Sequence, residues 1–202
     1  HLGTIIKHRH RVIRNGRHLG IYFHCWFHDL SKYSHVEFHN SAINYVGTSS
    51  PVFEQRKHNS YVSTICLHHT GRNKHHWEYW TDFFKGNIVM KTMPYKYALE
   101  YVADMLSASQ TYDPKGFKRD SALKYFQSRN NHYYATSATK EFVEWCLAQY
   151  AESKWANLKK KITKAKYQEI TSRLPDVEVL DTLHISEKIA ISSLEEYKDS
   201  TY

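Results

Sequence analysis

The adjacent residues His28 and Asp29 are the part of this sequence best suited to chemistry. An imidazole nitrogen beside a carboxylate oxygen can hold a divalent transition metal, and mixed ligation of this kind suits Mn, Fe, Co, Ni or Zn better than Mg or Ca. The pair ends an aromatic segment, residues 21–27, which we expect to hold both ligands rigidly and exclude bulk water. We therefore predict a metal site here with one or two ions. The alternative is a helix-terminal histidine beside a solvated aspartate.

Histidine is concentrated in one part of the chain. Of 15 histidines, 13 lie within the first 76 residues, many of them in pairs or near-pairs. A structural role alone gives no reason for such crowding, and an affinity tag would form a continuous run. The pattern favours histidines that act together as metal ligands or substrate contacts.

A second dense stretch surrounds a short glycine-containing turn. His68 and His69 precede this turn, His75 and His76 follow it, and Arg72 lies within it. We expect His69 and His76 to bind a second metal and His75 to act in catalysis, for example as acid to the leaving group. The alternative is that these rings stack on the aromatic residues at 77–80.

Two more ligands are expected from distant helices. Asp104 lies beside the core-facing stripe of a helix predicted at 94–110, where an unpaired buried charge would be costly. A metal would satisfy this carboxylate, as would a salt bridge to Lys or Arg. His8 is the candidate from the first helix. His10 is its rival, because the two are about 200° apart around a helix and only one is expected to face inward.

Four further residues are candidates for catalysis or substrate binding. Lys32 and Arg72 could neutralise a phosphate, Arg72 through its bidentate guanidinium, or they could cap a helix or pair with an acid. Glu37 and Glu78 could each serve as a general base or orient a ligand histidine. Glu37 also completes a capping box with Ser34, which would be a purely structural role.

The hydrophobic periodicity predicts an all-α protein. We expect one domain over residues 1–112 and a C-terminal helical extension, residues 113–202, packed on it. Asn15-Gly16 should end the first helix, and residues 52–58 and 85–93 should be irregular. The expected helices are 3–14, 17–30, 35–46, 59–69, 94–110, 119–128, 139–151, 152–172 and 185–197.

Composition limits the class of protein. The formal net charge of +8 favours an anionic partner such as phosphate, a nucleotide or nucleic acid. No apolar run is long enough to predict a membrane-spanning helix. The three cysteines are far apart and form no CxxC, so we expect a reducing, cytoplasmic setting.

The order of these residues resembles the HD-domain superfamily of metal-dependent phosphohydrolases. Residues 28–32 read HDLSK, which matches the HDxxK form of that motif, and His8 stands four residues before a valine as the first family histidine commonly does. Asp104 matches the distant aspartate on a later core helix. The resemblance covers about residues 4–112, and it implies an HD-like helical bundle that holds metal through His8, His28, Asp29 and Asp104.

A closer resemblance is to an uncharacterised family of bacterial and phage proteins, catalogued as a domain of unknown function. The segments HDLSKYSHVEF, LHHTGRNKHHWEYW and MPYKYALEYVADM are similar to segments of that family. Standard HD enzymes usually space their third and fourth histidines well apart, whereas His68-His69 and His75-His76 crowd around one turn. This departure leaves the ligands of a second metal open.

The favoured function is hydrolysis of a small phosphate ester, preferably a nucleotide, by attack of metal-bound hydroxide on phosphorus. One alternative is a non-catalytic module that binds a nucleotide or nucleic acid in the same basic, histidine-rich cleft. Another is a scaffold in which the cation only folds the domain. The sequence leaves open the substrate, the metal and the oligomeric state.

Overall fold

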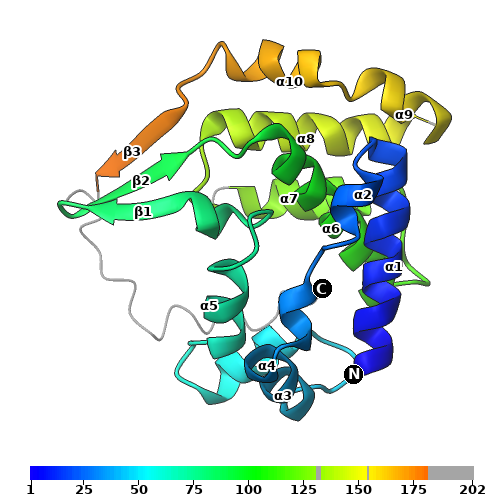
Figure 1. Cartoon of the computed structure of the whole chain (residues 1–202), viewed down its shortest axis with the longest axis vertical. Coiled ribbons are helices and arrows are strands. Elements are labelled where there is room, and N and C mark those ends of the chain that lie inside the picture. The colour runs from blue at the N-terminus through cyan, green and yellow to red at the C-terminus, as the bar shows by residue number, and fades with distance from the viewer. Residues whose placement is uncertain (131–132, 154, 182–202) are drawn as a thin grey trace.

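The computed structural model describes residues 1–130, 133–153 and 155–181. The chain is mostly helical, as predicted, and carries one small sheet (Figure 1). The helices are α1 (Leu2–Leu19), α2 (Tyr22–Cys25), α3 (His35–Ile43), α4 (Pro51–His58), α5 (Thr64–Thr70), α6 (Tyr95–Tyr112), α7 (Ser121–Arg129), α8 (Ser137–Glu152), α9 (Trp155–Lys161) and α10 (Lys164–Thr171). Two short 3₁₀ helices are η1 (Leu30–Tyr33) and η2 (Trp77–Trp80).

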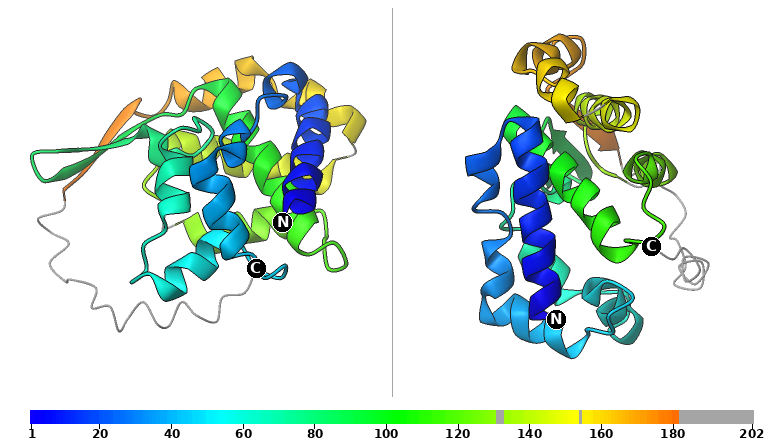
Figure 2. Two further views of the ribbon diagram at one scale, coloured as in Figure 1. Left: turned by 60° about the horizontal axis from the view of Figure 1, so that its bottom comes forward. Right: turned by 90° about the vertical axis from the view of Figure 1, so that its right-hand side faces the viewer.

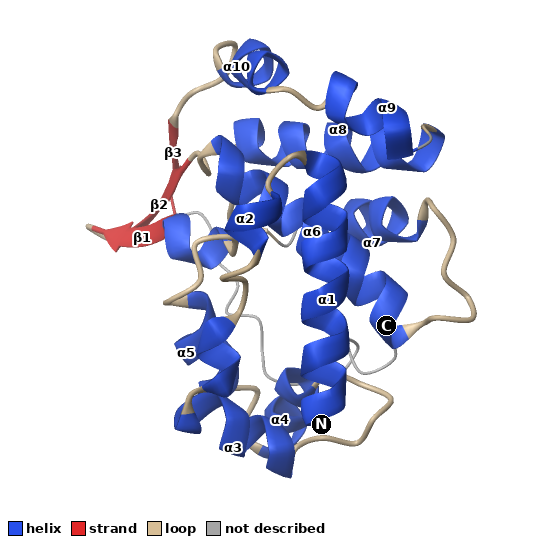
Figure 3. Cartoon of the chain, turned by 45° about the vertical axis from the view of Figure 1, so that its right-hand side comes forward, coloured by secondary structure: helices blue, strands red, loops and turns tan. Residues whose placement is uncertain are grey.

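Helices α1 and α6 form the central pair and pack along each other (Figure 3). On α1, Ile5, Val12 and Leu19 are buried at helical spacing, so that one stripe faces the interior. Helix α6 also packs against α8. It is therefore buried over a broader face than the predicted stripe, and Leu99, Val102 and Leu106 on it are all fully buried.

Helix α1 does not end at Asn15-Gly16, which corrects the sequence-based boundary. Both residues are buried inside the helix, where the Asn15 side-chain amide donates a hydrogen bond of 2.8 Å to Ser107 Oγ on α6. Gly16 leaves room for Cys25, whose Sγ would overlap with a Cβ at that position. These residues serve helix packing, and α1 ends at Gly20, which adopts the left-handed conformation at φ 83°.

The aromatic segment after α1 is not the long helix that we predicted over residues 17–30. Only α2 is α-helical there, and turns and η1 follow it. Asp29 has φ 54°, a left-handed conformation that aspartate tolerates better than most residues and that a continuous helix would not permit. The break places the His28-Asp29 pair in a tight turn that faces α6.

Helices α3, α4 and α5 form a separate layer at the bottom of Figure 1. Ser34 caps α3 by accepting a hydrogen bond from the backbone N–H of Glu37, as half of the predicted capping box requires. The segment 52–58, predicted to be irregular, is helix α4. It begins with Pro51 in the first turn, a position where proline removes no helical hydrogen bond.

The structure also contains a sheet that the all-α prediction omitted. Strands β1 (Thr81–Phe84) and β2 (Asn87–Lys91) form an antiparallel hairpin, and β3 (Val177–Asp181) pairs antiparallel with β2. Lys85 and Gly86 both have positive φ, as a tight two-residue hairpin turn requires. Figure 2 shows this hairpin projecting away from the helices.

The C-terminal helices share a hydrophobic core with the N-terminal ones. One buried cluster joins Val12 and Leu19 of α1 to Phe126, Phe142 and other residues on α6 to α10.

The basic helix predicted at 152–172 is two helices, because Thr163 caps α10 after a break. The helix predicted at 185–197 lies outside the described residues. Among the described residues, no helix has the length and apolarity needed to cross a membrane.

Candidate metal centre

Side chains from four parts of the chain converge between α1, α5 and α6. His8 comes from the middle of α1, the His28-Asp29 pair from the turn after α2, His69 from the end of α5, and Asp104 from α6. The loop before η2 adds His75 and His76. Of the two alternatives on the first helix, His8 is buried and faces this centre, whereas His10 is exposed.

His8, His28, Asp29 and Asp104 form the first group of potential ligands. One donor atom from each lies within 4.8 Å of the others. His8 Nε2 is 2.9 Å from Asp104 Oδ1, and His28 Nε2 is 3.6 Å from the same oxygen. This is the set that the sequence predicted for one metal, and the fold brings it together across more than 90 residues of chain.

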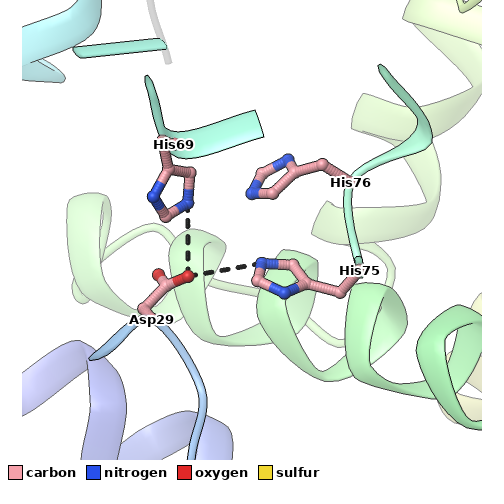
Figure 4. Close-up of side chains that lie close together, drawn as sticks. All are labelled: Asp29, His69, His75 and His76. Carbon is pink, nitrogen blue, oxygen red and sulfur yellow. Dashed lines mark ion pairs between the residues drawn. The ribbon is translucent and has the colours of Figure 1, made fainter. Parts of the chain in front are cut away.

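A second group contains Asp29, His69, His75 and His76, again with one donor atom from each within 4.8 Å of the rest (Figure 4). Asp29 Oδ1 is 3.2 Å from His69 Nε2 and 3.4 Å from His75 Nε2. Its other oxygen, Oδ2, is 3.1 Å from His28 Nε2. Asp29 therefore belongs to both groups, with a different oxygen facing each.

Several of these donor atoms are buried but lack a hydrogen-bond partner within the described chain. They are His8 Nε2, His28 Nε2, Asp29 Oδ1, His75 Nε2 and His76 Nε2. Most of these atoms lie within hydrogen-bonding distance of a polar neighbour, but the angles between them do not allow a hydrogen bond. His8 Nε2, 2.9 Å from Asp104 Oδ1, is one example. Buried polar atoms without partners are rare and costly. Their convergence fits a cation that would accept their lone pairs.

Glu100 is a residue of this centre that the sequence reasoning did not select. Its Oε1 lies 2.9 Å from His28 Nδ1 and 3.3 Å from His75 Nδ1, and its Oε2 lies 2.6 Å from His24 Nε2. A carboxylate on the second nitrogen of a ligand histidine fixes the tautomer and orientation of the ring. Glu100 stands one helical turn before Asp104, and this spacing was the available signal.

Glu37 plays the corresponding part for the second group. It is fully buried, with Oε2 2.8 Å from His69 Nδ1 and Oε1 2.7 Å from His68 Nδ1. Between the two roles predicted for Glu37, this position favours the orientation of a histidine over proton transfer to a substrate. His68 itself faces Glu37 and belongs to neither ligand group.

Lys32 and Arg72 have different surroundings. Lys32 forms an ion pair with Asp29 Oδ2, and its side chain is 32% exposed beside the centre. Arg72 is exposed, and no ion pair connects it to another described residue. The structure therefore places Lys32, but not Arg72, where a phosphate bound at the centre could reach it.

The two aspartates of the site are held in their charged form. Burial opposes ionisation of Asp29, but the charges of His28 and Lys32 hold its pKa well below the usual range. Burial also opposes ionisation of Asp104, but the nearby rings of His28 and His8 lower its pKa well below the usual value. Both carboxylates are thus charged at neutral pH, as metal binding requires.

The histidines of the site differ in the direction in which the protein shifts their pKa. Burial, reinforced by the charges of His75 and His69, lowers the pKa of His76 well below its usual value. Burial also lowers the pKa of His8. Burial alone would lower the pKa of His69 too, but the charge of Asp29 outweighs it and raises this pKa to about 9. A metal at the second group would therefore have to displace a proton from His69.

Two cavities meet at the centre. One, of about 370 Å³, is lined by aromatic side chains of α6, α7 and their neighbours, and the other, of about 270 Å³, lies toward α1, α3 and α4. His76 and Asp104 line both cavities. A molecule in either cavity would therefore contact the ligand groups directly.

The chain is mostly helical, and its histidines and carboxylates form a buried cluster that could hold a metal ion. The chain belongs to a family of unknown function (DUF5662), whose pattern matches residues 1–149. This match includes every residue of both ligand groups and extends past the predicted domain boundary at residue 112. No curated protein and no solved structure matches the chain.

Proposed function

We propose that the protein is a metal-dependent phosphohydrolase of the HD-like kind, with two divalent transition metal ions that share Asp29. The observation that carries this proposal is the convergence of buried donor atoms without hydrogen bonds on the two sides of one carboxylate. The mixture of nitrogen and oxygen donors favours Mn, Fe, Co, Ni or Zn. The sequence resemblance to HD-domain enzymes, which rests on four of the same residues, agrees with the proposal.

Bound divalent cations would lower the pKa of a coordinated water and neutralise charge on a phosphoryl oxygen. The chain supplies the rest. Lys32 is positioned to neutralise a second phosphate oxygen, since its ammonium lies beside Asp29 and lines the smaller cavity. Glu100 and Glu37 hold the ligand rings in place.

Two predicted catalytic roles change in this proposal. His75 is 1% exposed and its Nδ1 faces Glu100, so it serves better as a ligand than as acid to a leaving group. Arg72 is exposed and is assigned no part in the reaction. The favoured substrate remains a small phosphate ester such as a nucleotide, and the net charge of +8 agrees with an anionic ligand.

Elemental analysis paired with phosphate release tests this proposal. Wild-type protein, reconstituted with Mn, Fe or Zn, should bind about two ions per chain and release phosphate from members of a nucleotide panel. The double variant His28→Ala/Asp29→Ala should lose both properties. His35→Ala is the matched control, because His35 is exposed on α3 and belongs to neither ligand group.

Other outcomes favour the alternatives. Metal binding without cleavage of any phosphate ester would favour a nucleotide-binding or nucleic-acid-binding module, or a scaffold in which the cation only stabilises the fold. If wild-type protein binds no metal after reconstitution, the proposal is wrong.

A further inference from the structure

The two cavities that meet at the metal centre have different linings. The larger measures about 370 Å³, and much of its wall is apolar or aromatic, formed by residues such as Trp77, Met105, Phe117 and Tyr133. The smaller measures about 270 Å³ and has four hydroxyl side chains in its wall, those of Thr4, Ser41, Tyr45 and Ser50. Aromatic walls suit a flat ring, and hydroxyl groups both donate and accept hydrogen bonds. The two cavities therefore fit chemically different groups.

His76 and Asp104 connect the cavities, because both residues line both of them. Each belongs to a different ligand group. From this junction the larger cavity extends toward Tyr125 of α7, and the smaller one extends toward Ser41 of α3 and Val52 of α4. A phosphate beside His76 and Asp104 therefore has one cavity on each side. A ligand that fills both cavities carries a substituent on each side of its phosphate.

The walls of both cavities provide little positive charge. Among the described residues that line them, Lys32 is the single lysine and there is no arginine. Lys32 already forms an ion pair with Asp29, and the larger cavity adds the carboxyl groups of Asp104 and Asp113. One phosphate can lie against the metal groups, but any further phosphate would lie against these walls without compensating charge.

A phosphodiester has both a low charge and two substituents. It carries one negative charge, whereas a phosphate monoester carries about 1.5 to 2 at neutral pH. We propose that the substrate of this centre is a phosphodiester that places a flat ring in the larger cavity and a polar, uncharged substituent in the smaller one. The inference rests on the proposed function, because it places the phosphate at the ligand groups.

Hydrolysis of such a diester consumes one water molecule. The water oxygen forms a bond to phosphorus, and the bond between phosphorus and one ester oxygen breaks. One proton of the water passes to the leaving alcohol, and the other remains on the product monoester or is released to solvent. The product gains negative charge, for which the described walls provide no lysine or arginine beyond Lys32, so that release of the monoester is favoured.

A dinucleoside monophosphate tests the inference against the monophosphate and the triphosphate of the same nucleoside. Each compound is incubated with the metal-loaded protein, and its loss is followed by chromatography. The diester should have a kcat/KM at least about tenfold above that of either alternative, because it alone combines a single charge with a group for each cavity. A monophosphate or triphosphate that is cleaved as well as the diester would overturn the inference.

Binding gives a second readout that needs no turnover. A phosphorothioate diester keeps the single charge while its cleavage is slowed, and calorimetry measures its affinity for the metal-loaded protein. It should bind at least about tenfold more tightly than the corresponding nucleoside monophosphorothioate. Equal affinities would contradict the use of both cavities.

Two variants each fill one cavity. Ser50→Trp adds a large side chain to the smaller cavity, and Ser109→Trp adds one to the larger. Each should weaken binding of the phosphorothioate diester by at least about tenfold while the metal content is retained. Ser128→Trp is the matched control, because Ser128 is exposed on α7 and lines neither cavity. If either cavity variant binds the diester as tightly as the wild type, that cavity holds no substituent and the inference is wrong.

The two proposals fail in different ways. If the metal-loaded protein prefers the monophosphate or the triphosphate, the hydrolase proposal stands and the diester inference is wrong. If it cleaves none of the three compounds but binds the phosphorothioate diester selectively, the cavity assignment stands and the hydrolase proposal is wrong. If it neither cleaves nor binds any of them, both proposals are wrong.

Discussion

Glu100 Oε1 lies 2.9 Å from Nδ1 of His28, so that a buried carboxylate on α6 sets the ring orientation of a histidine in the turn after α2. The same carboxylate also faces His75, which belongs to the other ligand group. Glu100 thus connects the two groups, and with His28 and His75 it forms a third set of side chains close enough together to hold a cation. Its three histidine partners lower the pKa of Glu100 far below the usual value, although burial opposes this, and the group is charged.

Glu100→Gln should weaken metal binding while the fold is retained. The amide keeps the size of the side chain but cannot accept hydrogen bonds at both of its terminal atoms, so the ring orientations of His28 and His75 are less well defined. We expect a loss of about 10- to 100-fold in metal affinity. Competition with a chelator of known affinity measures it, and Glu141→Gln serves as control. Unchanged affinity would contradict the positioning role.

His8→Ala and His10→Ala should differ sharply in the metal content of the protein. His8 is buried at 2.9 Å from Asp104, whereas His10 is exposed on the same helix. Loss of the His8 ring should remove the ion of the first group, so that the metal content falls to about half, and His10→Ala should leave it unchanged. Elemental analysis after gel filtration gives both values. Equal losses in the two variants would show that α1 supplies no specific ligand.

Asp29→Asn should remove both ions, because its two oxygens face the two groups. The amide offers one neutral oxygen and an N–H₂ group in place of the second oxygen, so neither group keeps a charged ligand from residue 29. We expect a larger loss of metal than in His8→Ala. If Asp29→Asn keeps one full equivalent, the two groups do not depend on a shared carboxylate.

The stabilisation by metal should depend on pH. In the metal-free protein the pKa of His69 is about 9, above its ordinary value of 6.5, so protonated His69 stabilises the fold below pH 6.5. That stabilisation is lost as the pH rises from about 6.5 to about 9. When a metal occupies His69 Nε2, the proton no longer contributes to stability. Metal affinity instead rises with pH, because the competing proton is lost.

The difference in Tm between metal-loaded and metal-free protein should therefore grow from pH 6.5 to pH 9. Differential scanning fluorimetry with and without EDTA measures this difference across the range. The Asp29→Asn variant provides the baseline, since EDTA should not alter its Tm if it holds no metal. A difference that is constant with pH would show that His69 is not a ligand.

Gly16→Ala and Gly3→Ala test the packing of α1. A Cβ at residue 16 would overlap with Cys25 Sγ, whereas nothing lies within 4 Å of a Cβ at residue 3. Gly16→Ala should lower the free energy of unfolding by about 1–3 kcal/mol through overpacking. Gly3 lies exposed in the first turn of α1, so Gly3→Ala should change the free energy of unfolding by less than about 0.5 kcal/mol. Urea denaturation measures both, and a stabilising Gly16→Ala would contradict the close approach of Cys25.

Sequence alone was sufficient for much of the helical fold. Regular spacing of apolar residues identified the helix that became α6, and Ser34 identified the start of α3. It failed where local signals compete with packing. Asn15-Gly16 reads as a helix end in isolation, but Ser107 and Cys25, both distant in sequence, hold these residues inside a helix. The sheet was missed because β3 becomes a strand only by pairing with β2, almost 90 residues earlier.

The candidate site divides in the same way. Residue type and spacing selected His8, His28, Asp29 and Asp104, because ligand chemistry is a property of the side chain and can be read along the chain. Only the tertiary structure decided that Asp29 belongs to two groups and that Glu100 orients histidines in both. It also left Arg72 outside the centre. These relations depend on distances between elements remote in sequence, which packing of the whole core determines.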